Sequence, residues 1–135
     1  MEFNQLVLEK LHSLFTKYGL KISEQLKDTV RYESVKLTIS LAHNPKENSN
    51  ILWVGSKQTN DFVEMDNQVM KVFFDSDVSL ESLSQKEFVD NVLLFFTTDG
   101  KQILKGENDL LRRLERFDED RSEIYTSKLI EKQNL

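Results

Sequence analysis

Apolar residues at the start of the chain recur every three or four positions, the period that gathers side chains onto one face of a helix. The run begins at Phe3 and ends at Tyr18. Gly19 follows, and glycine readily adopts the left-handed conformation that closes a helix C-terminus. The pattern therefore predicts a helix over residues 2–18.

Further along the chain the period changes from helical to two. Apolar residues alternate with small or polar ones, as in a strand with one buried face: Val35, Leu37, Ile39 and Leu41. A polar segment at 44–50 contains the only proline, so we expect a turn there. Short apolar runs at 51–54, 62–65 and 69–74 predict the remaining strands. Their connections are too short for parallel crossovers, so the pattern predicts an antiparallel meander within residues 29–74.

Two helices are expected after the sheet. Ser84-Gln85-Lys86-Glu87 fits the capping-box pattern, in which the serine and glutamate side chains bond each other's backbone N–H groups. Helical spacing of apolar residues behind it predicts a helix over 85–97. Apolar residues from Leu110 to Tyr125 predict a third helix over 108–125. Residues 126–135 either continue this helix or fray.

The order of these elements defines a fold class. A sheet with one apolar face must bury it, and the segregated helices are the cover that the chain offers. We therefore expect a two-layer α+β fold, with a sheet of three to four strands, one N-terminal helix and two C-terminal helices. The 135 residues fit a single domain, 1–135, with 126–135 as its tail.

Composition argues against most kinds of catalytic site. The chain has no cysteine, which excludes disulfides, thiolate nucleophiles and cysteine-based metal sites. Its four glycines are isolated, so no glycine-rich phosphate loop is present, and no serine stands in a nucleophile-elbow motif. His12 and His43 lack metal-ligand or catalytic spacing. We expect no cofactor, no metal and no enzymatic activity.

The start of the chain carries no basic segment followed by an apolar run, and no stretch approaches the ~20 apolar residues that a bilayer requires. A cytoplasmic protein without membrane contact is therefore expected.

Negative charge is concentrated in the middle of the chain. The net charge is −5, and residues 50–98 carry eight carboxylates against three lysines. This balance disfavours nucleic acid, which needs a basic footprint, and favours a basic protein partner. We nominate the acidic residues at or near strand ends as partner-binding: Glu64, Asp66, Asp75 and Asp77. The alternative is that the acidic groups are spread around the domain and serve solubility.

Trp53 is a further candidate for partner binding. Its neighbours Leu52 and Val54 belong to the opposite face of the predicted strand, so Trp53 or that pair points outward unless both faces are covered. An exposed tryptophan on a strand is a plausible anchor for a partner protein.

Three short segments carry a resemblance to a known group. They are Lys17-Tyr18-Gly19-Leu20, Val30-Arg31-Tyr32-Glu33-Ser34 and Leu110 to Leu114, within the order of one helix, a meander and closing helices. The chain thereby resembles small uncharacterised bacterial α+β proteins of the toxin-immunity type. The resemblance implies a protein that works by binding another protein, and it assigns no binding residue.

The leading hypothesis is a non-enzymatic protein-binding module, of which an immunity-like inhibitor of a basic partner is the most concrete version. One alternative is a small-ligand-binding or enzymatic domain with a pocket between sheet and helices. The other is a homo-oligomeric structural protein.

Overall fold

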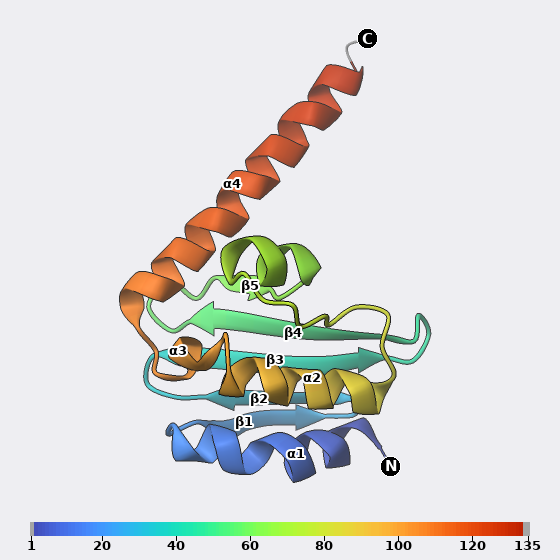
Figure 1. The fold of residues 1–135 in the computed structure, drawn as a ribbon, viewed down its shortest axis with the longest axis vertical. Coiled ribbons are helices and arrows are strands. Elements are labelled where there is room, and N and C mark those ends of the chain that lie inside the picture. The colour runs from blue at the N-terminus through green and yellow to red at the C-terminus, as the bar shows by residue number, and fades with distance from the viewer. Residues whose placement is uncertain (1, 134–135) are drawn as a thin grey trace.

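Five strands follow one another in the computed structural model of the chain, which describes residues 2–133 (Figure 1). They are β1 (Lys21–Leu26), β2 (Thr29–Glu33), β3 (Leu37–Asn44), β4 (Ser49–Ser56) and β5 (Phe62–Glu64). Each strand pairs antiparallel with the next, in the order β1-β2-β3-β4-β5. The predicted α+β class and antiparallel meander are confirmed, with five strands rather than three to four.

Two helices cover one face of this sheet. α1 (Phe3–Lys17) and α2 (Gln85–Thr97) pack against each other, and α1 also contacts β2 (Figure 1). Aromatic rings join the layers, since the ring of Phe15 lies 4.9 Å from that of Tyr32 and 5.6 Å from that of Phe96, both edge-on. Edge-to-face pairs of this kind add roughly 0.5–1.5 kcal/mol to the free energy of burial.

The strand predicted from the alternating segment is found as β3, Leu37–Asn44, but the prediction that it buries only one face is wrong, because Thr38 and Ser40 are also buried, and Val35 lies before the strand and is exposed. Leu37, Ile39 and Leu41 are buried against the helices, while Thr38 and Ser40 belong to the other face of the sheet. The helix predicted over 2–18 is found at Phe3–Lys17, and Gly19 closes it with a φ of 81°. The helix predicted over 85–97 is α2.

The sheet begins earlier than the predicted range of 29–74, because β1 precedes it. All six residues of β1 are exposed, including Ile22 and Leu26. An edge strand that buries neither face has no hydrophobic alternation for a pattern to detect, and this explains the omission. A shift of register between Ile22 and Glu24 distorts the edge, which is a common protection against pairing with other chains.

The strand predicted over 69–74 is wrong, because Val69–Phe73 forms a single π-helical turn, η1. The carboxylate of Asp66 accepts the N–H of Val69 at 3.0 Å, and the Asp66 carbonyl accepts the N–H of Met70 at 3.0 Å. These two bonds start a helical turn in a sequence whose apolar residues also suit a strand.

The C-terminal helix is longer than predicted. α4 (Asn108–Gln133) follows a short helix, α3 (Lys101–Leu104), that the pattern missed. Its first half buries Leu110, Leu111 and Leu114, whereas every residue from 122 to 133 is exposed. Figure 1 shows this second half running past β5 and away from the sheet. The 126–135 tail is thus helical through 133, and 134–135 lie outside the described residues. Within residues 2–133 no helix combines the length and apolarity needed to span a bilayer.

The predicted capping box is present at the start of α2, and it yields the first test. The Ser84 hydroxyl accepts the Glu87 N–H at 3.2 Å, and the Glu87 carboxylate accepts the Ser84 N–H at 3.3 Å. We expect Ser84→Ala to lower the free energy of unfolding by about 1 kcal/mol, measured by urea denaturation, because it removes the cap. Ser13→Ala, in the exposed interior of α1, is the control and should not lower it. Equal losses in both variants would contradict a capping role.

Candidate functional site

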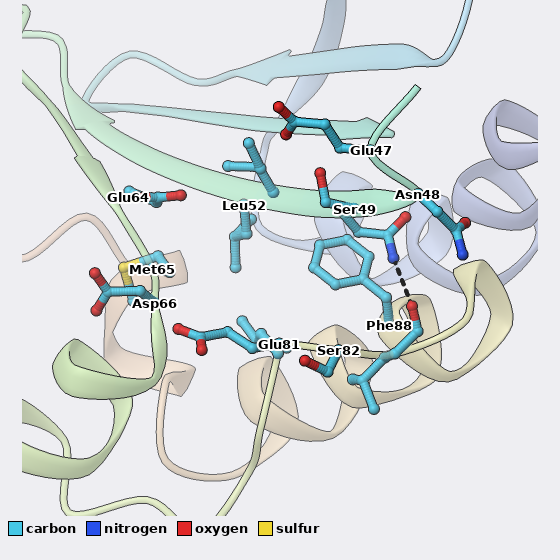
Figure 2. A pocket seen from close by; sticks show the side chains of 14 residues that line it. Glu47, Asn48, Ser49, Leu52, Glu64, Met65, Asp66, Glu81, Ser82 and Phe88 are labelled. Atoms are coloured by element: carbon cyan, nitrogen blue, oxygen red, sulfur yellow. Dashed lines mark hydrogen bonds between the residues drawn. The ribbon is translucent and has the colours of Figure 1, made fainter. Parts of the chain in front are cut away.

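A cleft of about 490 Å³ opens beside the first half of β4 (Figure 2). We call it the acidic cleft. Its apolar lining comes from buried side chains of β4, α2 and the segments that follow β5: Leu52, Met65, Leu80 and Phe88. Four carboxylates line it as well, from Glu47, Glu64, Asp66 and Glu81. Figure 2 shows Glu47 on one side of this space and Glu81 on the other.

The side chain of Asn50 ties one wall of the acidic cleft to the sheet. Its amide nitrogen donates to the carbonyl oxygen of Leu83 at 3.0 Å, the dashed line in Figure 2. Its amide oxygen lies 2.8 Å from Nδ1 of His43, which is buried and stacked on Phe3. The wall therefore depends on hydrogen bonds that reach from β4 to the core and to the loop before α2.

Asn67 holds the other wall. Its side-chain oxygen accepts the N–H of Leu80 at 3.0 Å, and its own N–H donates to the carboxylate of Glu81 at 3.0 Å. Asn91 on α2 adds a bond from its amide nitrogen to the carbonyl of Ser79 at 2.9 Å. The segment before α2 has no regular secondary structure, yet these bonds fix it, so the position of the Glu81 carboxylate is set by the fold.

Three of the four carboxylates, Glu47, Glu64 and Glu81, form no ion pair within residues 2–133, whereas Asp66 is paired with Arg121 from outside the cleft, and no lysine or arginine is among the lining residues. Partial burial raises the pKa of the Glu64 carboxyl group, and repulsion from the carboxylates of Asp66, Glu81 and Asp118 raises this pKa further, while Arg121 lowers it. Both causes disfavour the ionised form of Glu64. An approaching cation would offset the repulsion between these carboxylates.

A second hollow, the α4 groove, lies on the other side of Glu64 and Asp66, which line both spaces. It has a volume of about 900 Å³ between the outer face of the sheet and α4. Trp53 lines it, paired in register with Glu64 and facing away from Leu52 and Val54, which are buried. The predicted alternation of Trp53 with its neighbours is confirmed, and its side chain is half-buried.

Phe62 and Arg31 extend the outer face next to Trp53. The Phe62 ring lies over Gly55, where a Cβ atom would stand 2.9 Å from it, so the close approach requires glycine. The guanidinium carbon of Arg31 lies 5.5 Å from the centre of the same ring. Cation–π contact of this kind keeps the exposed ring in place.

Arg121 fixes α4 to the segment after β5. It donates to the Asp66 carboxylate at 2.8 Å, to the Asp118 carboxylate at 2.8 Å and to the Gln68 side chain at 3.1 Å. Arg121 is largely buried, with 18% of its side chain exposed. The charge of Asp66 is therefore neutralised within the molecule, which leaves Glu64 as the nominated carboxylate that faces solvent in this region.

The other two nominated residues lie elsewhere. Asp75 and Asp77 are exposed and line a separate hollow near Asp99 at the end of α2. Asp77 also forms an exposed ion pair with Lys71 at 3.4 Å. The structure thus brings Trp53, Glu64 and Asp66 together and places Asp75 and Asp77 apart from them.

Sequence reasoning missed Glu47, Glu81 and Arg121. Glu47 lies in the turn that contains the only proline, and Glu81 lies in a loop, so neither stands in a periodic pattern. Glu47 and Glu81 line the same cleft because of the long-range hydrogen bonds of Asn50 and Asn67. A local pattern carries no signal for such bonds.

The histidines take part in structural contacts. His12 on α1 lies 3.0 Å from the hydroxyl of Tyr32, whose burial raises its pKa to about 12. His43 bonds Asn50 and lies 3.2 Å from the Gln85 side chain. In the part of the chain that the structure describes, no three histidine, aspartate or glutamate side chains gather closely enough to hold a metal ion.

Comparison with known proteins adds no relative to this picture. No family model matches the chain, no curated protein matches its sequence, and no solved structure matches its fold.

Arg121→Met tests the attachment of α4. We expect the variant to lose about 1–3 kcal/mol of unfolding free energy in urea denaturation, because hydrogen bonds to two partly buried carboxylates disappear. Arg113→Met is the matched control, since it removes only an exposed ion pair with Asp109 and should stay within about 0.5 kcal/mol of the parent. Two variants of equal stability would show that Arg121 does not hold α4.

Glu64→Gln tests the electrostatics of the acidic cleft. Because its pKa is raised in the folded state, the folded protein binds the Glu64 proton more tightly than the unfolded chain does. Ionised Glu64 therefore costs stability at neutral pH, and Glu64→Gln should increase the free energy of unfolding at pH 7. The gain should shrink as the pH falls through the raised pKa and vanish below the unfolded value of about 4.3.

Chemical denaturation of parent and variant at pH 7, 5.5 and 4 measures this difference. Glu9→Gln on the exposed face of α1 removes a carboxylate away from the acidic cleft and serves as the control. A Glu64→Gln variant that is less stable than the parent at pH 7 would contradict the assigned environment.

Proposed function

We propose that this chain is a non-enzymatic protein-binding module whose acidic cleft takes a basic segment of a partner protein. The observation that carries the proposal is an apolar floor bordered by three carboxylates without an ion pair in the described part of the chain, Glu47, Glu64 and Glu81, with no basic side chain among the lining residues. Such a surface attracts lysine and arginine by charge and offers apolar contact to the side chains between them.

The continuity of the two hollows favours a polypeptide over a small molecule. The acidic cleft and the α4 groove meet at Glu64 and Asp66 and are open to solvent. A polypeptide that passes from the acidic cleft over Glu64 and Asp66 into the α4 groove reaches Trp53 and Phe62 next. A half-buried tryptophan and an exposed phenylalanine beside an acidic site suit a partner interface, because aromatic residues supply much of the binding energy at such surfaces.

An inhibitor of the immunity type is the most concrete version of this function. An immunity-like protein would use the acidic cleft to cover a basic surface of its target, and electrostatic attraction would speed their encounter. Glu47 and Glu81 join Glu64 and Asp66, which the sequence predicts to bind a partner, in lining this cleft.

The exposed end of α4 favours a second candidate, a homo-oligomer. Four large apolar side chains lie exposed on this helical segment: Ile124, Tyr125, Leu129 and Ile130. Exposed apolar groups close together often mark a surface that another chain covers. This candidate predicts a mass in solution of twice that of one chain. The double variant Leu129→Ser and Ile130→Ser should return the mass to that of one chain.

The test of the basic-partner proposal uses a probe peptide of eight residues that alternates lysine and valine. We expect it to shift the backbone amide resonances of the residues lining the acidic cleft, and its affinity to fall as the salt concentration rises from 50 to 300 mM. The same peptide with glutamate in place of lysine should not bind. The triple variant Glu47→Gln, Glu64→Gln and Glu81→Gln should bind the lysine peptide about tenfold more weakly.

The matched control is the triple variant Glu9→Gln, Glu107→Gln and Glu131→Gln, which changes the net charge equally at exposed positions outside the cleft. It should bind as the parent does. Equal weakening of both triple variants would show that net charge alone attracts the peptide. Resonance shifts confined to other surfaces would exclude the acidic cleft as the binding site.

A further inference from the structure

β4 is only partly covered by its neighbour β5. Of its eight residues, Trp53, Val54 and Gly55 pair with β5, and the N–H of Met65 adds one more bond, to the carbonyl of Leu52 at 2.8 Å. The chain then turns into η1. Across residues 2–133, no strand pairs with the β5 side of Ser49–Ile51.

The backbone of Asn50 faces this open edge. In an antiparallel ladder the N–H and C=O groups of one residue point to the same side of the strand, and this side alternates along the chain. The carbonyl of Leu52 points toward β5, so the N–H and C=O of Asn50, two residues earlier, point the same way. Ser49 and Ile51 face β3 instead, where they pair with Asn44 and Ala42.

The open edge borders the acidic cleft, which Ser49, Asn50, Ile51 and Leu52 help to line. About four residues of extended chain, roughly 13 Å, would fit alongside them. The Asn50 side chain holds its own strand in place through Leu83 and His43, so the edge is fixed before a partner arrives. Preorganisation of this kind lowers the entropy cost of binding.

Charge selects the occupant of this edge. A second copy of the chain would bring the same carboxylates, Glu47, Glu64 and Glu81, against those already present, and like charges repel. A basic strand would meet them favourably. Its alternate side chains would point to the inner face, over the floor formed by Leu52 and Phe88, and to the outer face, where Ile51 lies.

We propose that the partner of the acidic cleft binds as an extended strand that adds to β4 at Asn50, with alternating apolar and basic side chains. This inference rests on the proposed function and specifies its binding mode. The backbone of the added strand bonds the N–H and C=O of Asn50, and its lysine or arginine side chains pair with Glu47, Glu64 and Glu81.

The experiment compares two forms of the eight-residue lysine–valine peptide. One has normal amides, and the other carries N-methyl groups on every second amide, which removes the donors of one edge while keeping every side chain and charge. Affinity for the full chain is measured by titration at 50 mM salt, followed at the backbone amide of Asn50. We expect the methylated peptide to bind at least about tenfold more weakly, because strand pairing is lost.

A third peptide, methylated on the alternate set of amides, controls for the stiffening that methylation causes, and it should retain binding through its unmodified edge. Equal salt-dependent binding of all three peptides would overturn strand addition and leave the basic-partner function standing. If none of the three peptides binds, both proposals are overturned.

Discussion

The site depends on the point at which the chain leaves the sheet. β5 pairs with three residues of the eight-residue strand β4, and after Met65 the backbone turns away. Asp66 stabilises this turn. Its carboxylate accepts the N–H of Val69 at 3.0 Å and forms an ion pair with Arg121 of α4 at 2.8 Å. A longer β5 would continue along β4 and cover the edge at Asn50. The same two contacts therefore end the sheet, start η1, attach α4 and leave the acidic cleft open.

Asparagine side chains give the acidic cleft its shape. Asn50 and Asn67 each bond the backbone of the segment before α2, at Leu83 and at Leu80. This segment has no helix or strand of its own, so side-chain bonds to its backbone groups replace the ladder that a strand would supply. Glu64 lies opposite, where partial burial and then repulsion from neighbouring carboxylates raise the pKa of its carboxyl group. The rigid frame thus holds like charges near one another, an arrangement that favours a cationic partner.

The fold was largely readable from the sequence, and the acidic cleft was not. Periodicity located α1 and α2 because each buries one face, and β3 because its apolar residues alternate with small or polar ones although both of its faces are buried. It also placed Trp53 on the face opposite Leu52 and Val54. It missed β1, which buries neither face. It assigned Val69–Phe74 to a strand, because a short apolar run is compatible with a strand or a helix. The hydrogen bond from the N–H of Val69 to the Asp66 carboxylate favours the helical turn that the structure shows. Glu47 and Glu81 come to line the same cleft as Glu64 through the long-range bonds of Asn50 and Asn67, which leave no trace in local spacing.

The acidic cleft can receive a strand only if the edge of β4 is open in the free protein, and amide hydrogen exchange measures this directly. In the free chain, the N–H of Ile51 pairs with β3 and should exchange slowly, whereas the N–H of Asn50 faces the cleft and should exchange much faster. The predicted result is slow exchange of the Ile51 amide beside fast exchange of the Asn50 amide. An Asn50 amide protected as strongly as that of Ile51 would show that the edge is already covered, and it would contradict the account of this site.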